Sequence, residues 1–564
     1  MTQSRKWQTY PQAPADFLGK KSGLERLLGQ LLYNRGFKTA EEIENFLRAD
    51  EKPLHDPFIF QDMGKAVEVI IKHIKAGKKI FIYGDYDADG ITSSVLLYDL
   101  FSIFKTDPGV YMPDRVSEGY GLNKGAVDKM VEEGASLIIT VDTGIRNKEE
   151  VDYARKQGTE VIVTDHHTPP EKKEDLPDCL IVDPVLKREE YPCKKLAGVG
   201  VAYKLAQALV SESTLEENKK KILQERLLDL VAIGTVADCV ELTGENRILV
   251  KRGLKVLNHT GRVGLQELIN STGLKDKIDS WNIGFQIAPR INASSRMDHA
   301  ARAFYLLISR DRSEAKEKAG DLNEKNSSRQ RETEKALAEA LEQAGEEKSE
   351  IIITVSKNKN PWPEGIIGLV AGRLNSLYYR PALAITRSGG ELKGSGRSIE
   401  EFNLVKALEE TKDLLSNYGG HPAACGFSLE EKNLDKFFKK IRDYAHQKLR
   451  KTELLPKIKI DAELDMKEID GDLFNSLEKL APFGEGNPKP VFLSRGAQIR
   501  DMIRMGKKGE HIKFRFNGIW GIFFGQSENC SHFKIGDKAD IVYYLDMNNF
   551  NGKSEVQLKI IDIS

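Results

Sequence analysis

The sequence has no apolar run that approaches the roughly 20 residues needed to cross a bilayer, so we expect no membrane contact. The first residues, MTQSRKWQTYPQAP, lack the apolar core of a secretory signal peptide, which predicts a cytoplasmic protein. Cysteine is rare, with 5 in 564 residues and no CxxC spacing. So few thiols argue against a disulfide framework and against a cysteine-bound zinc site.

Net charge is absent as well. Lys and Arg together number 85, and Asp and Glu together also number 85. The molecule therefore has no strong positive field, and any binding of nucleic acid must depend on local clusters of basic residues. The sequence contains no internal repeat and no long low-complexity linker. At roughly 100–200 residues per domain, a chain of this length should form several domains.

Short apolar runs alternate with helix-like stretches between residues 60 and 240. The candidate strands are KKIFIYG (78–84), SLIITVD (136–142), TEVIVTDHH (159–167) and CLIVDP (179–184), and the helix-like segments include 64–76 and 146–157. Short buried strands that alternate with helices are typical of βαβ units around a parallel sheet. The pattern therefore predicts an α/β fold.

Three further parts follow. Residues 311–348 are polar, rich in Glu, Lys, Ala and Gln, and free of proline, which predicts a long exposed connector helix. A second β/α pattern comes next, and from residue 456 the apolar period becomes two (KIKIDAEL, HIKFRF, ADIVYYL, EVQLKIIDI), which predicts a small β-barrel. We therefore divide the chain into an N-terminal segment (1–55), an α/β domain (56–310), the connector helix (311–348), a second α/β domain (349–455) and the barrel (456–564).

Acidic residues and histidines follow three of the predicted strands where each strand ends. These endings are Asp85-Tyr86-Asp87-Ala88-Asp89-Gly90, Asp142, and Asp165-His166-His167. Alternate residues of an extended chain share a face, so Asp87 and Asp89 can face one site. Ligands of open parallel sheets bind beyond the carboxyl ends of the strands, where we expect the three clusters to meet.

Carboxylates packed this closely would repel one another unless cations lay among them. Oxygen ligands with one or two imidazoles suit Mn²⁺ or Mg²⁺, and two such ions about 3.5–4 Å apart commonly serve phosphoester hydrolysis. A single Asp after a strand is more often a turn former or a helix cap. Three such endings in successive strands favour the metal site. A further acid, Asp238 in the apolar run LVAIGTVADCVEL, fits capping and function equally well.

The sequence resembles the DHH phosphoesterase superfamily through four ordered motifs: DYDADG (85–90), VDTG (141–144), DHH (165–167) and GTVADC (234–239). It resembles the RecJ-type exonucleases of that superfamily through PDRVSEGYG (113–121), PRINASSRMD (289–298), GIIGLVAGRL (365–374), GSGRS (394–398) and GGHPAACG (419–426). The likeness runs from about residue 50 to the end. It implies a parallel-sheet DHH domain, a DHHA1 domain after the connector helix, and an OB-like fold for the C-terminal barrel.

The resemblance implies a set of metal ligands, namely Asp87, Asp89, Asp142, His166 and Asp238. Asp142 would bridge two ions, His167 would contact the scissile phosphate, and Asp165 would orient its neighbours. Asp142, Asp165 and His167 thus form the expected catalytic set. We leave Asp85 outside the ligand set, as a structural or supporting residue.

The resemblance also implies contacts to the substrate. GSGRS and GGH resemble the phosphate-contacting loops of DHHA1 domains, which gives Ser395, Arg397 and His421 this role. Glycines let backbone amides approach an anion closely, and arginine offers a bidentate fork, although a Gly-Ser-Gly sequence alone is commonly a flexible loop. Arg290 and Arg296 resemble contacts to backbone phosphates near the metals. Arg290 fits a structural ion pair equally well.

Two positions depart from the family's pattern. Pro363 follows Trp362 where a histidine is common, so no role of that histidine is carried over. Ser295 stands where a glycine is common, and we expect it to stiffen a loop there. Neither position belongs to the predicted ligand set.

The predicted barrel carries a local excess of positive charge. Its basic residues between 495 and 515 are Arg495, Arg500, Arg504, Lys507, Lys508, Lys513 and Arg515, against the acids Asp501 and Glu510. OB folds hold single strands through basic grooves and aromatic platforms. Phe514 and Phe516 share one strand face, which favours a place in the barrel core. The basic residues therefore carry the binding prediction.

The resemblance implies an exonuclease that hydrolyses single-stranded DNA 5′ to 3′ to mononucleotides, using two Mn²⁺ or Mg²⁺ ions, in DNA repair and recombination. We expect a monomer whose partners are single-stranded DNA, a single-strand-binding protein and a helicase. There are two alternatives. A phosphodiesterase for short oligonucleotides or other small phosphoesters would not need the barrel, and a non-catalytic replication-fork scaffold would not need the acidic cluster.

Overall fold

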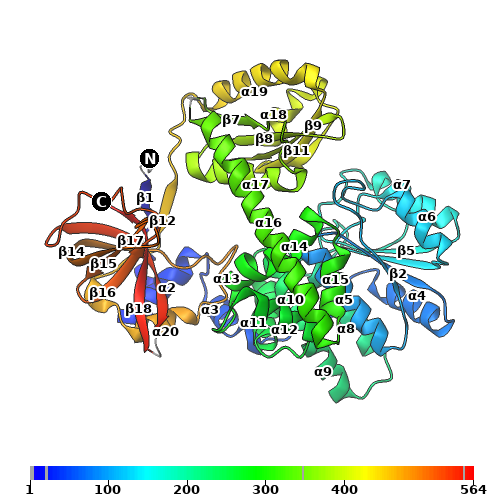
Figure 1. Ribbon diagram of the computed structural model, residues 1–564. Coiled ribbons are helices and arrows are strands. Elements are labelled where there is room, and N and C mark those ends of the chain that lie inside the picture. The colour runs from blue at the N-terminus through cyan, green and yellow to red at the C-terminus, as the bar shows by residue number, and fades with distance from the viewer. Residues whose placement is uncertain (1–4, 20–22, 346–348, 358, 551–552) are drawn as a thin grey trace. The chain divides into compact units, whose positions relative to one another are not determined.

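The computed structural model describes residues 5–19, 23–345, 349–357, 359–550 and 553–564 (Figure 1). The chain forms two compact units. The large unit comprises His55–Asp238 and Arg252–Leu454, and the small unit comprises the residues up to Leu54, Cys239–Lys251 and Leu455–Ser564. Within the described ranges, no helix has both the length and the apolar character that a membrane span requires.

A five-stranded parallel sheet, in the order β3-β2-β4-β5-β6, opens the large unit. The strands are β2 (Ile80–Gly84), β3 (Gly109–Tyr111), β4 (Leu137–Val141), β5 (Glu160–Thr164) and β6 (Leu180–Val182). Every residue of β2 and β4 is buried, as expected for strands covered on both faces. The α/β prediction is confirmed. The predicted strands correspond to β2, β4, β5 and β6, whereas β3 is a three-residue edge strand too short to show a period.

Helices pack against both faces of this sheet. They are α4 (Met63–Lys75), α5 (Ala88–Ile103), α6 (Lys124–Glu132), α7 (Lys148–Lys156) and α8 (Gly198–Ser211). Met130 of α6 and Val151 of α7 share one apolar cluster with Phe81 and Ile138, so these two helices cover one face. Helix α5 contacts β2 and β4, helix α8 contacts β4 and β5, and the two helices pack on each other.

A helical region follows the sheet. Its members are α9 (Glu217–Arg226), α10 (Leu228–Ala237), α11 (Gly244–Leu257), α12 (Val263–Thr272), α13 (Ser280–Asn282), a π-helical turn (Ile283–Ile287), α14 (Ala288–Met297) and α15 (Ala301–Ile308). The segment PRINASSRM is thus helix α14, and the expected loop at Ser295 is wrong. Ser295 is buried, and its hydroxyl donates to the carbonyl of Asn292 one turn earlier (3.2 Å).

The predicted connector is a single helix, α16 (Arg312–Ala344). It packs on α12, α14 and α15 and then on α17 (Glu364–Tyr378) of the second α/β domain, as Figure 1 shows. The second sheet has the order β10-β11-β9-β8-β7. Its elements are β7 (Ile352–Val355), β8 (Ala382–Ser388), β9 (Glu391–Arg397), α18 (Leu404–Glu409), β10 (Asn417–His421), β11 (Ala424–Leu429) and α19 (Leu434–Leu449).

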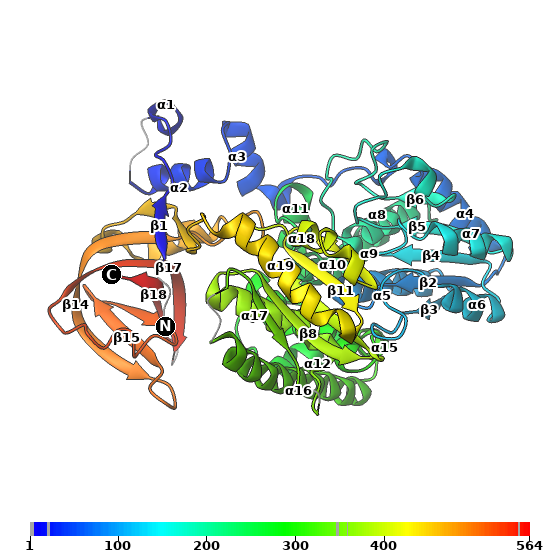
Figure 2. The same cartoon turned by 90° about the horizontal axis from the view of Figure 1, so that it is seen from above.

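Alternate residues of β8 face the two sides of this second sheet. Leu383 and Ile385 pack with Phe437 of α19, which lies along one face in Figure 2, while Ala382 and Ala384 pack with Val370 of α17. Small alanines on the α17 side allow the helix to approach the sheet closely. The second α/β domain therefore has helices on both faces.

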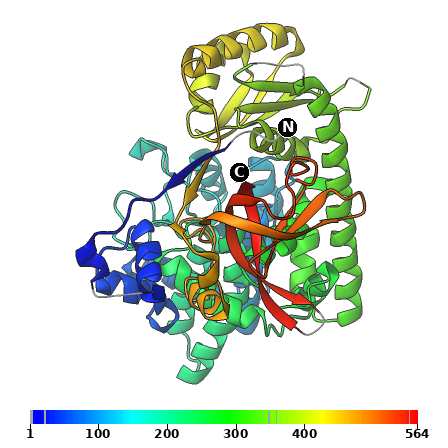
Figure 3. The same ribbon diagram turned by 90° about the vertical axis from the view of Figure 1, so that its left-hand side faces the viewer.

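The small unit contains a closed five-stranded barrel, since β14 pairs with β17 as well as β15 (Figure 3). Its strands are β14 (Phe492–Met505), β15 (His511–Phe516), β16 (Ile519–Phe523), β17 (Lys538–Phe550) and β18 (Lys553–Ile563). Phe514 and Phe516 are fully buried, which confirms their place in the core. The barrel prediction is also confirmed, except that KIKI lies outside the barrel as β12 (Lys457–Ile460).

The N-terminal residues belong to the small unit. Strand β1 (Lys6–Thr9) pairs in parallel with β12, and Leu31 and Phe46 share the apolar cluster of the barrel. Further elements of the small unit include α1 (Ala15–Leu18), α2 (Gly23–Asn34), α3 (Ala40–Leu47), β13 (Ala462–Glu463), α20 (Gly471–Glu478) and the first part of α11, up to Lys251. The predicted domain boundaries give no sign of this association.

Candidate active site

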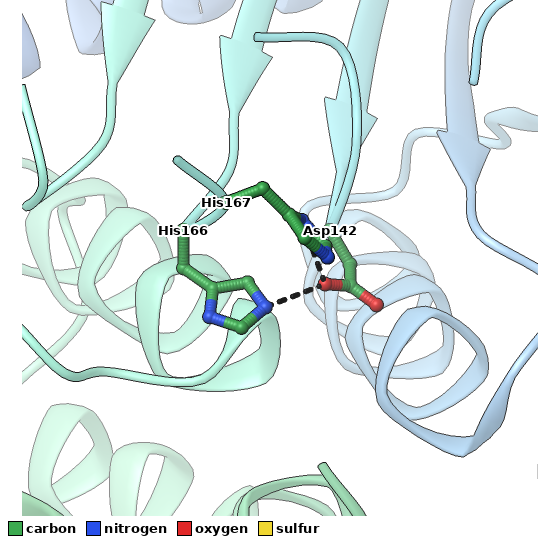
Figure 4. A group of neighbouring side chains, drawn as sticks. All are labelled: Asp142, His166 and His167. Carbon is green, nitrogen blue, oxygen red and sulfur yellow. Dashed lines mark ion pairs between the residues drawn. The ribbon is translucent and has the colours of Figure 1, made fainter. Parts of the chain in front are cut away.

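The carboxyl ends of β2, β4 and β5 bring the predicted acids and histidines together. His166 Nε2 lies 3.1 Å from Asp142 Oδ1, 3.6 Å from Asp238 Oδ2 and 4.0 Å from Asp89 Oδ2. His167 Nδ1 lies 3.9 Å from Asp142 Oδ1, so both rings approach the same carboxylate (Figure 4). Three groups have side-chain N or O atoms within 4.8 Å of one another: Asp142-His166-His167, Asp89-His166-Asp238 and Asp85-Asp87-Asp142.

Local backbone features hold these carboxylates in place. Asp87 is the N-cap of α5 and accepts a hydrogen bond from the amide of Asp89 (2.9 Å). Asp89 in turn accepts hydrogen bonds from the amides of Gly198 (2.7 Å) and Val199 (2.9 Å) in the first turn of α8. A Cβ atom at Gly198 would lie 2.6 Å from the Asp142 side chain, so glycine is required there. Asp87 is thus both a helix cap and a member of the acidic cluster.

Asp165 organises the two histidines. Its Oδ1 accepts hydrogen bonds from the amides of His166 (2.7 Å) and His167 (3.2 Å) and lies 2.8 Å from His167 Nδ1. Its Oδ2 accepts from the amide of Ile145 (2.9 Å). The hydroxyl of Tyr120 lies 3.0 Å from the same His167 Nδ1. These contacts fix the His167 ring, which is the arrangement that an orienting role for Asp165 requires.

Burial and mutual repulsion dominate the electrostatics of the cluster. Burial, reinforced by neighbouring carboxylates, raises the pKa of Asp89 to about 7 and of Asp238 to about 9, and it raises the pKa of Asp142 well above its usual range. Burial lowers the pKa of His166 to about 4. Burial also opposes protonation of His167, but the Asp165 carboxylate outweighs it and raises that pKa to about 9. The protein's own groups therefore do not balance the negative charge of the clustered carboxylates.

The residues fit divalent cations. Three buried atoms of the cluster have no hydrogen-bond partner within the described part of the chain: Asp85 Oδ1, Asp142 Oδ1 and His166 Nε2. Each buried polar atom left in this state costs about 1–3 kcal/mol. A cation would satisfy all three, and carboxylate oxygens with imidazole suit Mn²⁺ or Mg²⁺. Asp85 thus lies inside the cluster, although its position in DYDADG was the only sequence signal for it.

A cavity of about 730 Å³ lies in the same unit. Its lining residues include Tyr86, Arg115, Tyr120, Arg296, Gly365, Gly368, Gly394, Ser395, Arg397, Gly419 and Gly420. Ser395 and Arg397, predicted to contact the substrate, thus line one cavity together with Arg296. His421 is exposed at the end of β10, directly after the lining residue Gly420. Its assigned role stays a prediction.

The cavity also contains a cation that the sequence analysis did not assign. The guanidinium of Arg115 lies 4.8 Å from the centre of the Tyr86 ring and lines the cavity with Arg296 and Arg397. Arg115 belongs to the motif PDRVSEGYG, and this motif was the sequence signal that could have identified it. Arg290 lies outside the lining and donates to the side chain of Asn323 (3.0 Å), so its contact is a neutral hydrogen bond and not an ion pair.

The basic residues of the barrel differ in their surroundings. Arg495 is ion-paired with Glu463 (3.0 Å) and Asp540 (3.2 Å). Lys513 and Arg515 of β15 lie over the ring of Trp520, at 4.7 and 5.6 Å from its centre. The other four are exposed on β14 or in the turn after it, at Arg500, Arg504, Lys507 and Lys508. Trp520 is an aromatic neighbour of the basic strand that the sequence analysis missed.

The departure at Pro363 affects the start of a helix. Pro363 is the N-cap of α17, and Trp362 before it is buried, with its indole donating to Glu339 of α16 (3.3 Å). The Trp362 side chain thus holds α17 against the connector helix.

Comparison with known proteins gives a consistent assignment. Family models match as the DHH family, N-terminal domain (residues 79–235), the DHHA1 domain (347–447) and the RecJ OB domain (460–562). The single-stranded-DNA-specific exonuclease RecJ of Bacillus subtilis is 38% identical over 547 residues, which span 95% of this chain and 67% of that protein. The protein of the same name from Dickeya dadantii is 34% identical, over 95% of this chain and 96% of its own.

Solved structures agree. The crystal structure of RecJ from Thermus thermophilus in complex with Mn²⁺ has a TM-score of 0.84 and 30% identity, and covers 99% of this chain and 79% of its own. Its counterpart in complex with Mg²⁺ has a TM-score of 0.76 and 27% identity, over 99% and 78%. Because the three domain models match in order and a curated relative is 38% identical over 95% of this chain, the chain belongs to the RecJ family of single-stranded-DNA-specific exonucleases.

Proposed function

We propose that this chain hydrolyses single-stranded DNA from the 5′ end and releases mononucleotides, with two Mn²⁺ or Mg²⁺ ions at the acidic cluster. The observation that supports this most directly is the set of unpartnered buried atoms, Asp85 Oδ1, Asp142 Oδ1 and His166 Nε2, at the ends of parallel strands. Membership of the RecJ family supplies the substrate class.

In this proposal, the residues that would hold the ions are Asp87, Asp89, Asp142, His166 and Asp238, and Asp142 would serve both ions because it belongs to two of the three groups. Asp85 joins the ligand candidates, because its Oδ1 groups with Asp87 and Asp142. Two bound divalent ions lower the pKa of an attacking water and offset the charge that develops on the phosphate and the leaving 3′-oxygen. No covalent nucleophile from the protein is needed.

The protein groups orient the substrate. Asp165, fully buried, fixes the His167 ring by the contact at 2.8 Å, so that the protonated imidazole can donate to the scissile phosphate. The Asp165 carboxylate raises the pKa of His167 to about 9 in the metal-free protein, which favours the protonated, donating form of the ring. Arg115, Arg296 and Arg397 line the adjoining cavity and suit the phosphates of a strand end. The acidic cluster alone does not distinguish the 5′ end of a strand from the 3′ end. The adjoining cavity therefore supports recognition of the 5′ terminus.

A strand labelled at either end tests the proposal. With Mn²⁺, 5′-labelled single strands should release labelled mononucleotide at once, while 3′-labelled strands shorten progressively and duplex DNA is spared. Metal chelation should stop both reactions. Cleavage confined to short oligonucleotides would favour a small-phosphoester enzyme, and binding without cleavage in Mn²⁺ would favour a scaffold.

The proposal also covers the cellular setting. We infer a cytoplasmic monomer that acts in DNA repair and recombination beside a single-strand-binding protein and a helicase. Light scattering of the purified protein tests the monomer. Stimulation of digestion on strands coated with single-strand-binding protein, or on duplexes opened by a helicase, tests the partners.

A further inference from the structure

The connector helix α16 carries a partly buried cation, Arg329, that has no anion partner among the described residues. The buried positions of the helix are Ala315, Ala319, Leu322, Asn326, Ala336, Ala340 and Ala344. Arg329 lies in the middle stretch between Asn326 and Ala336, where no residue is fully buried. The helix packs on the first α/β domain before this stretch and on the second after it. Arg329 is half-buried there.

The guanidinium of Arg329 has no partner. Within the described ranges, no hydrogen bond or ion pair reaches it, and its Nε is buried without an acceptor. Several other cations of α16 are paired, such as Lys318 with Glu314 (3.4 Å) and Lys335 with Glu332 (3.0 Å). A partly buried cation without an anion is costly, and a phosphate group would compensate it with charge-assisted hydrogen bonds.

Arg329 is one of several arginines that have no anionic partner among the described residues. Arg290 of α14 donates only to neutral groups, namely Asn323 of α16 (3.0 Å) and the carbonyl of Gln286 (2.6 Å). Arg296, further along α14, donates to the carbonyl of Gly365 (2.8 Å). Burial lowers the pKa of Arg296 to about 9, and the charges of Arg115, Arg329 and Arg397 lower it further.

Helix α14 connects this group to the acidic cluster. Its Asn292 side chain accepts a hydrogen bond from the amide of Ala88 (2.8 Å), the residue between Asp87 and Asp89. Arg296, on the same helix, lines the cavity that contains Arg397. Unpaired positive charge therefore continues from the cavity, along α14, to the middle of α16.

We propose that Arg329, with Arg290 beside it, binds an internal phosphate of the bound single strand, so that the connector helix forms part of the substrate groove. The inference rests on the proposed function, because it assumes a nucleic-acid strand at the acidic cluster. Arg329 acts as a positioning residue: it holds a phosphodiester of any sequence and does not contact the reacting atoms.

The test compares Arg329→Gln with Arg331→Gln, an exposed arginine two residues along the same helix and so on another side of it. Binding of a fluorescent 20-mer is measured by anisotropy in chelating buffer, over a range of salt concentrations. For Arg329→Gln we expect the Kd to rise about tenfold or more, and the slope of log K against log salt to weaken by about 0.7. Arg331→Gln should resemble the wild type. Arg329→Lys should restore the slope.

Stability separates this role from a structural one. Arg329→Gln removes an unpaired cation, so its Tm should equal or exceed that of the wild type. An unchanged Kd, or a Tm that falls together with binding, would overturn the inference. Failure of the proposed function gives a different result, since the wild type would then bind strands without degrading them in Mn²⁺.

Discussion

Replacing Arg397 by glutamine should reduce the ability of the protein to distinguish a 5′-phosphate from a 5′-hydroxyl. Arg397 lines the cavity, and among the described residues its NH1 donates only to Ser395 Oγ (3.4 Å) and to the carbonyl of Gly396 (2.8 Å). Burial lowers its pKa, and no carboxylate of the described part of the chain forms an ion pair with it. Such a group is available for a terminal phosphate.

The size of the effect follows from one charge-assisted hydrogen bond. Losing such a bond costs about 1.5–3 kcal/mol, which is roughly a tenfold to hundredfold change. Arg397→Gln should slow digestion of 5′-phosphorylated strands by about this factor. Strands with a 5′-hydroxyl have no terminal phosphate for Arg397 to bind, so their digestion should be slowed much less. The ratio of the two rates should therefore fall toward one.

Initial rates on internally labelled strands with either terminus measure this ratio. Lys393→Gln is the matched control, because Lys393 lies on the same strand and lines the same cavity but is already paired with Glu391 (3.4 Å) and with Ser428 (3.0 Å). Its ratio should stay near that of the wild type. If Arg397→Gln and the wild type digest the two kinds of strand in the same ratio, this cavity does not recognise the terminal phosphate.

Three further outcomes are expected. Asp142→Asn should abolish hydrolysis and the rise in Tm on adding Mn²⁺ while single-strand binding persists; near-normal turnover would contradict the metal assignment. The double variant Lys513→Gln/Arg515→Gln should reduce the slope of log K against log salt for binding to long strands by about 1.4, while cleavage of dinucleotides is unchanged. An equal loss on both substrates would indicate a folding role for β15. In metal-free buffer, the free energy of unfolding should fall as pH rises from 6.5 toward 9. The raised pKa values of Asp89 (about 7), Asp238 (about 9) and His167 (about 9) mean that the folded state holds more protons than the unfolded state in this range. Denaturant titrations in chelator should show this fall, and a stability that does not change with pH would refute the reasoning.

The ends of the strands could be predicted from sequence because their signal is local. An apolar run followed by Asp or His marks a residue at the edge of a parallel sheet, as at Asp142 and His166, whatever the rest of the chain does. Asp85 shows the limit of this reasoning. Its neighbours in sequence suggest a structural residue, and only the folded chain shows its Oδ1 buried without a partner beside Asp87 and Asp142.

Other features depend on distant contacts or on signals that were overlooked. Arg329 is one of many charged residues in a polar helix, and nothing in that pattern distinguishes it from its paired neighbours. The parallel pairing of β1 with β12 joins segments about 450 residues apart, which no local period encodes. The helix α14 was foreseeable, because Pro289 in its first turn is a common helix start.

The shared core of residues up to Leu54 and Leu455–Ser564 has a consequence for biosynthesis. A ribosome makes the N-terminal helices first, but Leu31 and Phe46 meet their barrel neighbours only after the last strands emerge. His55–Leu454 contains all of the large unit, which can fold in that interval. Each new molecule should therefore complete its acidic centre before its barrel, with the apolar face of α2 exposed until translation ends. Chaperone binding to nascent chains that stop before residue 455 would reveal this waiting state.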